Sequence, residues 1–120
     1  MSYPVYDLLR LDAGVIAIVG TRIYAAGAMP PETAMPALTY QVITGQPENY
    51  LDGVPTIERQ RVQVDAWAAG LAAAEQLQSA ARVAVIAGGR NVCISNNGHD
   101  YEPETKRYRA SRDYEVWVDL

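Results

Sequence analysis

The sequence is poor in the residues on which metal centres and nucleophilic active sites depend. Its 120 residues include one cysteine, Cys93, and one histidine, His99. A single cysteine excludes an intramolecular disulfide, and this pair cannot supply the nitrogen and sulfur ligands of a structural zinc site. We therefore expect neither a metal nor a cofactor.

Motifs for nucleophilic catalysis and phosphate binding are also missing. No serine lies in a Gly-x-Ser-x-Gly elbow, and Gly88-Gly89 lacks the spacing and the Lys-Ser/Thr pair of a phosphate loop. A half-buried cysteine and a loop histidine are the simplest interpretation of Cys93 and His99. The sequence thus predicts a protein that is not an enzyme. A small hydrolase or ligand-binding domain that uses Cys93 and His99 is the alternative from another functional class.

Basic residues and long apolar runs are scarce. The net charge is −4, which argues against a dedicated DNA- or RNA-binding module, because affinity for phosphates rests largely on lysine and arginine. DNA can still pass such a protein without binding to it. The longest apolar stretches, near residues 13–19 and 83–87, are too short to cross a membrane, and the first residues do not resemble a signal peptide. We expect a soluble protein made in the cytosol.

Phenylalanine is absent, whereas there are eight tyrosines and two tryptophans. Tyrosine and tryptophan combine apolar area with a polar group, which suits surfaces that become buried on assembly; compositional drift is the alternative explanation. The length, with 49% hydrophobic and 20% charged residues, indicates one globular domain over residues 1–120.

The clearest local pattern lies at residues 57–68, where apolar and polar residues alternate. The apolar side comprises Val62, Val64, Ala66 and Ala68, and the polar side comprises Arg59, Arg61, Gln63, Asp65 and Trp67. This period of two predicts a strand with one buried face. From residue 70 the spacing becomes helical, which predicts a helix over 70–87 with Leu71 on its apolar stripe and Gln78 on its wet face.

The remaining segments predict the other elements of the fold. Two short helices come first, the second capped by Asp12 and closed by Gly20. A brief extended piece follows at 22–24, with strands at 37–44, 91–95 and 109–120. Asn96-Asn97-Gly98 reads as a hairpin turn or as a bulge in a longer arm. This order predicts an α+β fold, with an antiparallel or mixed β-sheet of about four to five strands and helices packed on one face.

The connection between the strands at 37–44 and 57–68 is long for a hairpin. It carries Tyr50 and Leu51 near its tip, between turn-forming residues. Loops of this length are often functional. The two residues therefore form either a partner-binding tip or a lid folded back over the core of the domain.

Several segments occur along the chain in an order and spacing typical of one known family. They are Arg22–Tyr24, Pro36–Tyr40, Leu51–Gly53, Arg61–Ala68, Tyr101–Glu102, Glu104–Tyr108 and Asp113–Trp117. In this arrangement the sequence resembles the bacteriophage tail completion family, also called tail terminator or tail-to-head joining proteins. The resemblance extends over almost the whole chain, and none of the matching segments is catalytic.

The resemblance implies a structural virion protein that is made in the cytoplasm of a bacterial host. Its subunits would form a homohexameric ring at the head-proximal end of a long tail. Such a ring ends tail-tube polymerisation, contacts the tail tube protein and the head connector, and lets DNA pass through its channel without specific binding. Another neck component, such as a connector or adaptor, is the alternative within the same setting.

The polar side of the 57–68 strand is the main candidate for contact with a neighbouring copy. If this strand pairs with the last one, Arg59, Arg61 and Asp65 form a charge ladder with Asp113 and Glu115, and in an oligomer such charges specify register between subunits. Aromatic anchors dominate many interfaces. The candidate interface residues are therefore Tyr50, Leu51, Arg59, Arg61, Asp65, Trp67 and Trp117.

Overall fold

The computed structural model describes residues 4–47, 57–89 and 91–119. In chain order the elements are α1 (Val5–Arg10), α2 (Ala13–Val19), β1 (Ile23–Ala25), β2 (Ala37–Pro47), β3 (Ile57–Ala68), α3 (Leu71–Ile86), β4 (Val92–Glu102) and β5 (Arg107–Asp119). The predicted α+β class is confirmed.

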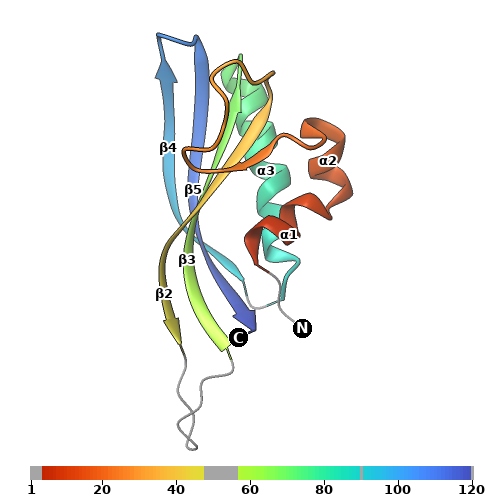
Figure 1. Ribbon diagram of the computed structural model, residues 1–120, viewed down its shortest axis with the longest axis vertical. Helices are drawn as coiled ribbons and strands as arrows, with labels where there is room; N and C mark the ends of the chain where they lie inside the picture. Colours follow the sequence, from red (N-terminus) through yellow and green to blue (C-terminus); the bar gives the residue numbers. More distant parts are fainter. Residues whose placement is uncertain (1–3, 48–56, 90, 120) are drawn as a thin grey trace, which may run out of the picture.

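The five strands form one mixed sheet in the order β1-β2-β3-β5-β4. All neighbours are antiparallel except β1 and β2, which are parallel over three residues. The sheet is strongly twisted, so the order of the strands across the view reverses between its two ends (Figure 1). The three helices lie together on one side of the sheet, with α3 packed against β3 and β5 (Figure 1).

The alternation in β3 sorts its side chains between the two faces of the sheet. On the helix-facing side Val62, Val64 and Ala66 are fully buried, and the burial of one such valine contributes about 1.5–3 kcal/mol. The opposite side, which we call the outer face, carries two rows of side chains. They are Arg59, Arg61, Gln63, Asp65 and Trp67 from β3, and Arg109, Ser111, Asp113, Glu115 and Trp117 from β5.

Helix α3 supplies most of the cover on the helix-facing side, and two of its residues were assigned to the wrong face. Leu71, expected on the apolar stripe, is exposed, because it lies in the first turn of the helix. Gln78, expected on the wet face, is fully buried. Its spacing from Ala74 and Ala81 places it on the buried stripe, and helical geometry overrides the polarity of its side chain.

The buried amide of Gln78 joins α3 to the two central strands. Its Nε2 donates hydrogen bonds to the carbonyl oxygens of Val64 in β3 and Ala110 in β5, at 2.8 and 2.7 Å. Its Oε1 accepts a hydrogen bond from the hydroxyl of buried Tyr114, at 2.9 Å. A buried amide stabilises a fold only when such partners are present, and here both ends of the group are satisfied.

The expected caps of α2 are present, and the structure decides between a hairpin turn and a bulge for the Asn-Asn-Gly segment. Val15 N donates to the Asp12 carboxylate at 3.0 Å, and Gly20, with φ of +59°, ends α2. The Asn-Asn-Gly segment forms a bulge, because the β4–β5 register shifts between Asn96 and His99 and Gly98 has φ of +79°. Strand β4 therefore continues to Glu102, well beyond the predicted end at residue 95.

Because of Tyr114, the stability of the fold should fall as the pH rises through the alkaline range. Burial raises the pKa of its hydroxyl above the ordinary value of 10.0. The unfolded chain loses this proton above about pH 10 while the folded chain keeps it, so stability falls as the pH rises through that region. Tyr114→Phe removes both this effect and the hydrogen bond to Gln78.

We expect Tyr114→Phe to lower the free energy of unfolding by about 1–2 kcal/mol at neutral pH. The difference from the wild type should narrow at about pH 11. Urea denaturation at both pH values measures the change. Tyr101→Phe, at an exposed position in β4, is the matched control and should behave as wild type. An unchanged difference between wild type and Tyr114→Phe at the two pH values would contradict the assignment.

Candidate subunit interface

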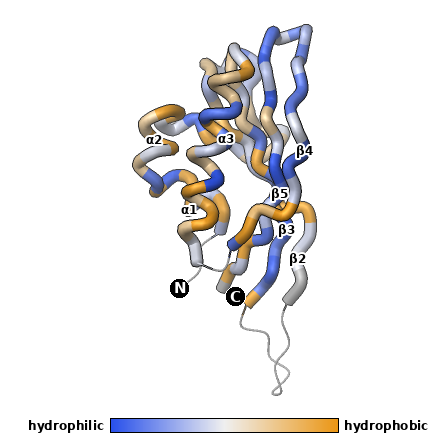
Figure 2. Tube along the Cα trace, turned by 180° about the vertical axis from the view of Figure 1, so that it is seen from behind, coloured by the Kyte–Doolittle hydropathy of each residue, from blue (hydrophilic) through white to orange (hydrophobic). Residues whose placement is uncertain are grey.

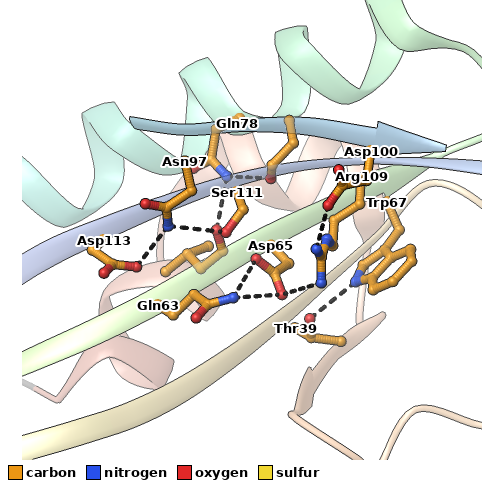
Figure 3. A network of polar contacts seen from close by, with 12 residues as sticks. Thr39, Gln63, Asp65, Trp67, Gln78, Asn97, Asp100, Arg109, Ser111 and Asp113 are labelled. Atoms are coloured by element: carbon orange, nitrogen blue, oxygen red, sulfur yellow. Dashed lines mark hydrogen bonds and ion pairs between the residues drawn. The ribbon is translucent and has the colours of Figure 1, made fainter. Parts of the chain in front are cut away.

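The outer face is held together by polar contacts between side chains of β2, β3, β4 and β5. Arg109 of β5 lies near the centre of one group (Figure 3). Its guanidinium pairs with Asp100 at 2.5 Å and approaches Asp65 to 3.9 Å, and it lies over the Trp67 ring, 5.7 Å from the ring centroid. The Trp67 indole nitrogen donates to Thr39 Oγ1 at 3.0 Å. These contacts hold the indole in one orientation on the face.

A second group surrounds Asp113, whose side chain is almost fully buried. Arg61 donates to its Oδ2 from Nη2 and Nε, at 2.7 and 3.0 Å. Asn97, from the bulge of β4, donates to its Oδ1 at 2.9 Å and to Ser111 Oγ at 3.3 Å (Figure 3). A charge-assisted pair of this kind is stronger than a neutral hydrogen bond. Together, the contacts of Asp113 with Arg61 and Asn97 link β4 to β3 across β5.

The second tryptophan, Trp117, lies on the outer face near the C-terminal end of β5. Arg59 lies over the Trp117 ring at 5.9 Å from its centroid and is 3.9 Å from the Glu115 carboxylate. Backbone N–H of Trp117 donates to the buried side chain of Asn91 at 2.9 Å. Each tryptophan of the chain thus has an arginine across its ring, and both pairs join β3 to β5.

The structure brings five of the candidate interface residues onto one surface. Arg59, Arg61, Asp65, Trp67 and Trp117 all lie on the outer face. Tyr50 and Leu51 lie outside the described residues. The predicted charge ladder is present within one subunit, since Arg61 pairs with Asp113 and Arg59 approaches Glu115. Its charges therefore set the register between β3 and β5 of the same chain.

Sequence reasoning did not find the residues that complete these groups. They are Thr39, Asn97, Asp100 and Arg109. The Asn-Asn-Gly signal allows a hairpin turn as well as a bulge, so it does not by itself place Asn97 beside Asp113 or Asp100 beside Arg109. The Asn-Asn-Gly signal itself was sound, because it marks the bulge that aims Asn97 at Asp113.

A loop crosses the end of the outer face nearest the β4–β5 turn. Residues 26–36 run over this end (Figure 1), where the Arg107 guanidinium donates to the carbonyl oxygen of Pro31. Between Trp67 and the turn lies a cavity of about 290 Å³ lined by Asp100, Glu102, Glu104 and Arg109 among others. The indole is therefore partly covered and partly accessible.

The structure separates Cys93 from His99. Cys93 pairs with Tyr114 and packs against the core, with Sγ 3.8 Å from the carbonyl oxygen of Ser95. His99 pairs with Ala110, and its Nδ1 lies 3.5 Å from the exposed Glu75 carboxylate of α3. Among the described residues, the contacts of Cys93 and His99 are therefore with other groups and not with each other. Within residues 4–47, 57–89 and 91–119 no three His, Cys, Asp or Glu side chains cluster as metal ligands would.

The large hydrophobic side chains that stay exposed are unevenly distributed over the described residues. Five of the ten lie on β2 and β4, and the other five lie on or next to the helices. One side, along β2 and the adjoining helices, has Tyr6, Ile16, Val42 and Ile43; the other, along β4, has Val92, Ile94 and Tyr101. Exposed apolar surface that is gathered in this way is typical of interaction sites.

The chain thus has a twisted sheet with helices on one side, an outer face rich in polar contacts, and exposed apolar side chains along β2 and β4. The chain belongs to the family described as tail completion protein gp17, whose model matches residues 4–119. It is therefore a structural protein of the tail or neck of a bacteriophage or phage-like virion, and it assembles with other virion proteins.

A solved structure has the same fold. A chain from the virion of a native gene transfer agent particle aligns with a TM-score of 0.62 over 97% of this chain and 92% of that chain, at 20% sequence identity. No curated protein sequence matches the chain. None of the helices in the described part of the chain has the length and apolar character needed to span a bilayer.

The group around Asp113 predicts unequal effects of two similar substitutions. Asp113→Asn weakens the Arg61 pair at a buried site, and we expect the free energy of unfolding to fall by about 1–3 kcal/mol. Glu115→Gln on the same strand removes a longer and more exposed pair and should cost less than about 1 kcal/mol. Thermal and urea denaturation of both variants measures the difference. Equal losses would show that burial of the Asp113 pair does not matter.

Proposed function

We propose that the chain is a tail terminator. Identical copies, six in number, form a ring at the head-proximal end of the tail, where the ring ends polymerisation of the tail tube and provides the surface on which the head connector docks. Membership of the tail completion family supports this role, as does the common fold with a chain of a gene transfer agent virion.

The observation that carries the proposal is the pair of unlike apolar edges. A closed ring needs a heterologous contact, in which two different patches of each subunit meet. The side along β2 and the side along β4 are such a pair, because they bear different residues, β4 is the last strand at one edge, and β2 extends beyond the short β1 at the other. An isologous dimer would require one patch that matches itself.

The outer face is the second contact surface that we assign to the ring. Its charges are largely paired within the subunit, so it presents Trp67 and Trp117 on a surface that needs little ordering when a partner binds. From the sequence alone, we assign Tyr50 and Leu51 to contacts with the tube or the connector. Because the chain belongs to a structural tail family, we infer that the protein is not an enzyme.

The charge of the chain fits a channel through which DNA moves. With a net charge of −4 per copy, a ring of six would repel phosphates more than it binds them. We infer that DNA passes through without specific binding. On this proposal the protein is made in the cytoplasm of the bacterial host and then joins the virion.

Deletion of the gene for this chain from the genome that encodes the particle tests this role. Electron micrographs should show tails of uncontrolled length that do not join heads, because nothing ends tube polymerisation. Supply of the chain from a plasmid should restore tail length and infectious or gene-carrying particles. Tails of normal length that fail only to join heads would instead identify the chain as a connector or adaptor.

The same complementation test addresses the outer face. Trp67→Ala removes an indole that is partly exposed. We expect the variant to lose more of its ability to restore tail length, relative to the wild type, than of its thermal stability. Val83→Ala, at an exposed position on α3, is the control and should restore tails fully. If Trp67→Ala does not fold, Trp67 is a core residue and its assignment to the interface is wrong.

A further inference from the structure

Two strands of the sheet have a backbone edge without a partner among the described residues. Strand β1 pairs with β2 only from Leu38 to Tyr40, which leaves one side of β2 free from Gln41 onward. Strand β4 pairs with β5 alone. Unpaired N–H and C=O groups along an edge are a template for another strand, and proteins usually protect them.

The free edges lack one usual protection, which is charge. The segments Gln41–Gly45 and Val92–Asn96 contain no charged residue, although charged side chains are the common guard against unwanted pairing. Each segment instead exposes two apolar side chains. Val42 and Ile43 are 46% and 42% exposed, and the two on β4, Val92 and Ile94, are 47% and 42% exposed.

These two segments lie at the same level of the sheet. One row of the register runs from Val42 through Val62 and Tyr114 to Cys93, and so crosses all four long strands. Beside this row each edge has a bulge, at Ile43 in β2 and at Ile94 in β4, where the register shifts. Bulges bend a strand, so both edges are kinked next to this row, β2 on the side of Glu115 and β4 on the side of Asp113. Figure 2 shows that β4 begins with a hydrophobic stretch and is hydrophilic along most of its remaining length.

The strand directions allow the two edges to pair. Because β2, β3, β5 and β4 are antiparallel in succession, β2 and β4 run in opposite directions within one subunit. Rotation about an axis that runs along the strands keeps these directions. The β2 edge of one copy then meets the β4 edge of the next as an antiparallel pair, and the contact repeats around the axis until the ring closes.

We propose that neighbouring copies are joined by antiparallel pairing of the segment Gln41–Gly45 in β2 of one copy with Val92–Asn96 in β4 of the next, which makes the sheet continuous around the ring. This inference rests on the ring proposed above and names the contact that closes it. The occupant of each edge is a second copy of this chain, because the two edges are complementary. Their strands run in opposite directions, and both have exposed apolar side chains at the same level of the sheet.

Lysine substitutions at the two bulges test the pairing. Ile43→Lys and Ile94→Lys each place a charge at an exposed position, so folding should be unaffected, while burial of an unpaired charge should weaken every subunit contact by about tenfold or more. Each variant is added to tails from the deletion strain, and electron microscopy counts the tails that end in a ring. Val83→Lys, at an exposed position on α3, is the matched control and should form rings as the wild type does.

A compensating variant separates pairing of the two edges from a general effect of charge. When Ile43→Lys is combined with Ile94→Glu in one chain, opposite charges meet across each contact, and the fraction of tails with rings should recover. Circular dichroism of every variant verifies that the fold is intact. Recovery in the double variant, with loss in Ile43→Lys and Ile94→Glu alone, is the result expected of direct pairing.

Other outcomes distinguish the two proposals. If wild-type rings form and both lysine variants form them equally well, the edge pairing is wrong and the ring stands. Loss in the single variants without recovery in the double variant would mean that each edge meets another tail protein, which also overturns pairing between copies. If the wild type caps no tails, the proposed function fails, and the edge pairing fails with it.

Discussion

The antiparallel register between β3 and β5 determines which side chains enter the core and which face outward. A slip of one residue would move Val62 and Val64 to the outer face and carry arginine and aspartate into the core. Two buried polar contacts oppose such a slip from opposite sides of the sheet. Gln78 binds carbonyl oxygens of both strands from the helix side, and Arg61 pairs with nearly buried Asp113 from the outer side. Both contacts need the native register, so they add specificity to the non-directional attraction of the apolar face.

The surface therefore has two kinds of region. In one, the polar groups already have partners within the subunit, and in the other, backbone hydrogen-bonding groups of the described residues do not. On the outer face most charges meet a partner within the subunit, so this face is rigid and contributes shape and aromatic area. Along β2 and β4 one side of the backbone has no partner among the described residues, over segments with no charged residue and with exposed Val42, Ile43, Val92 and Ile94. On the proposed assembly, the second kind of surface supplies strength, while the first supplies aromatic area that needs little ordering when a partner binds.

Much of the fold could be predicted because its signals are local. Strand β3 has the bounds that its alternation predicted, and Asp12 caps α2 as its position before an apolar run indicated. The contacts of Gln78 could not be predicted, because the strand carbonyls that bind its amide lie 14 and 32 residues away in the chain. Its spacing along α3 was the available signal, and it was set aside in favour of polarity. The groups around Arg109 and Asp113 were missed for the same reason, since they require the full course of β4 past its bulge. Five of the interface candidates lie on one face as expected, because alternation alone assigns a face, and their part in an interface stays a prediction.

The proposed assembly is a single closed ring at the junction of tail and head, in which copies of this chain are joined through the edges of their sheets. Cryo-electron microscopy of the intact particle tests it most directly. We predict one closed ring of identical copies at that junction, with β2 of each copy beside β4 of the next and the outer-face tryptophans near neighbouring chains. The claim would be contradicted if the chain were repeated along the tail tube, were located at the distal tip, or were held in the ring by its helices with both sheet edges left free.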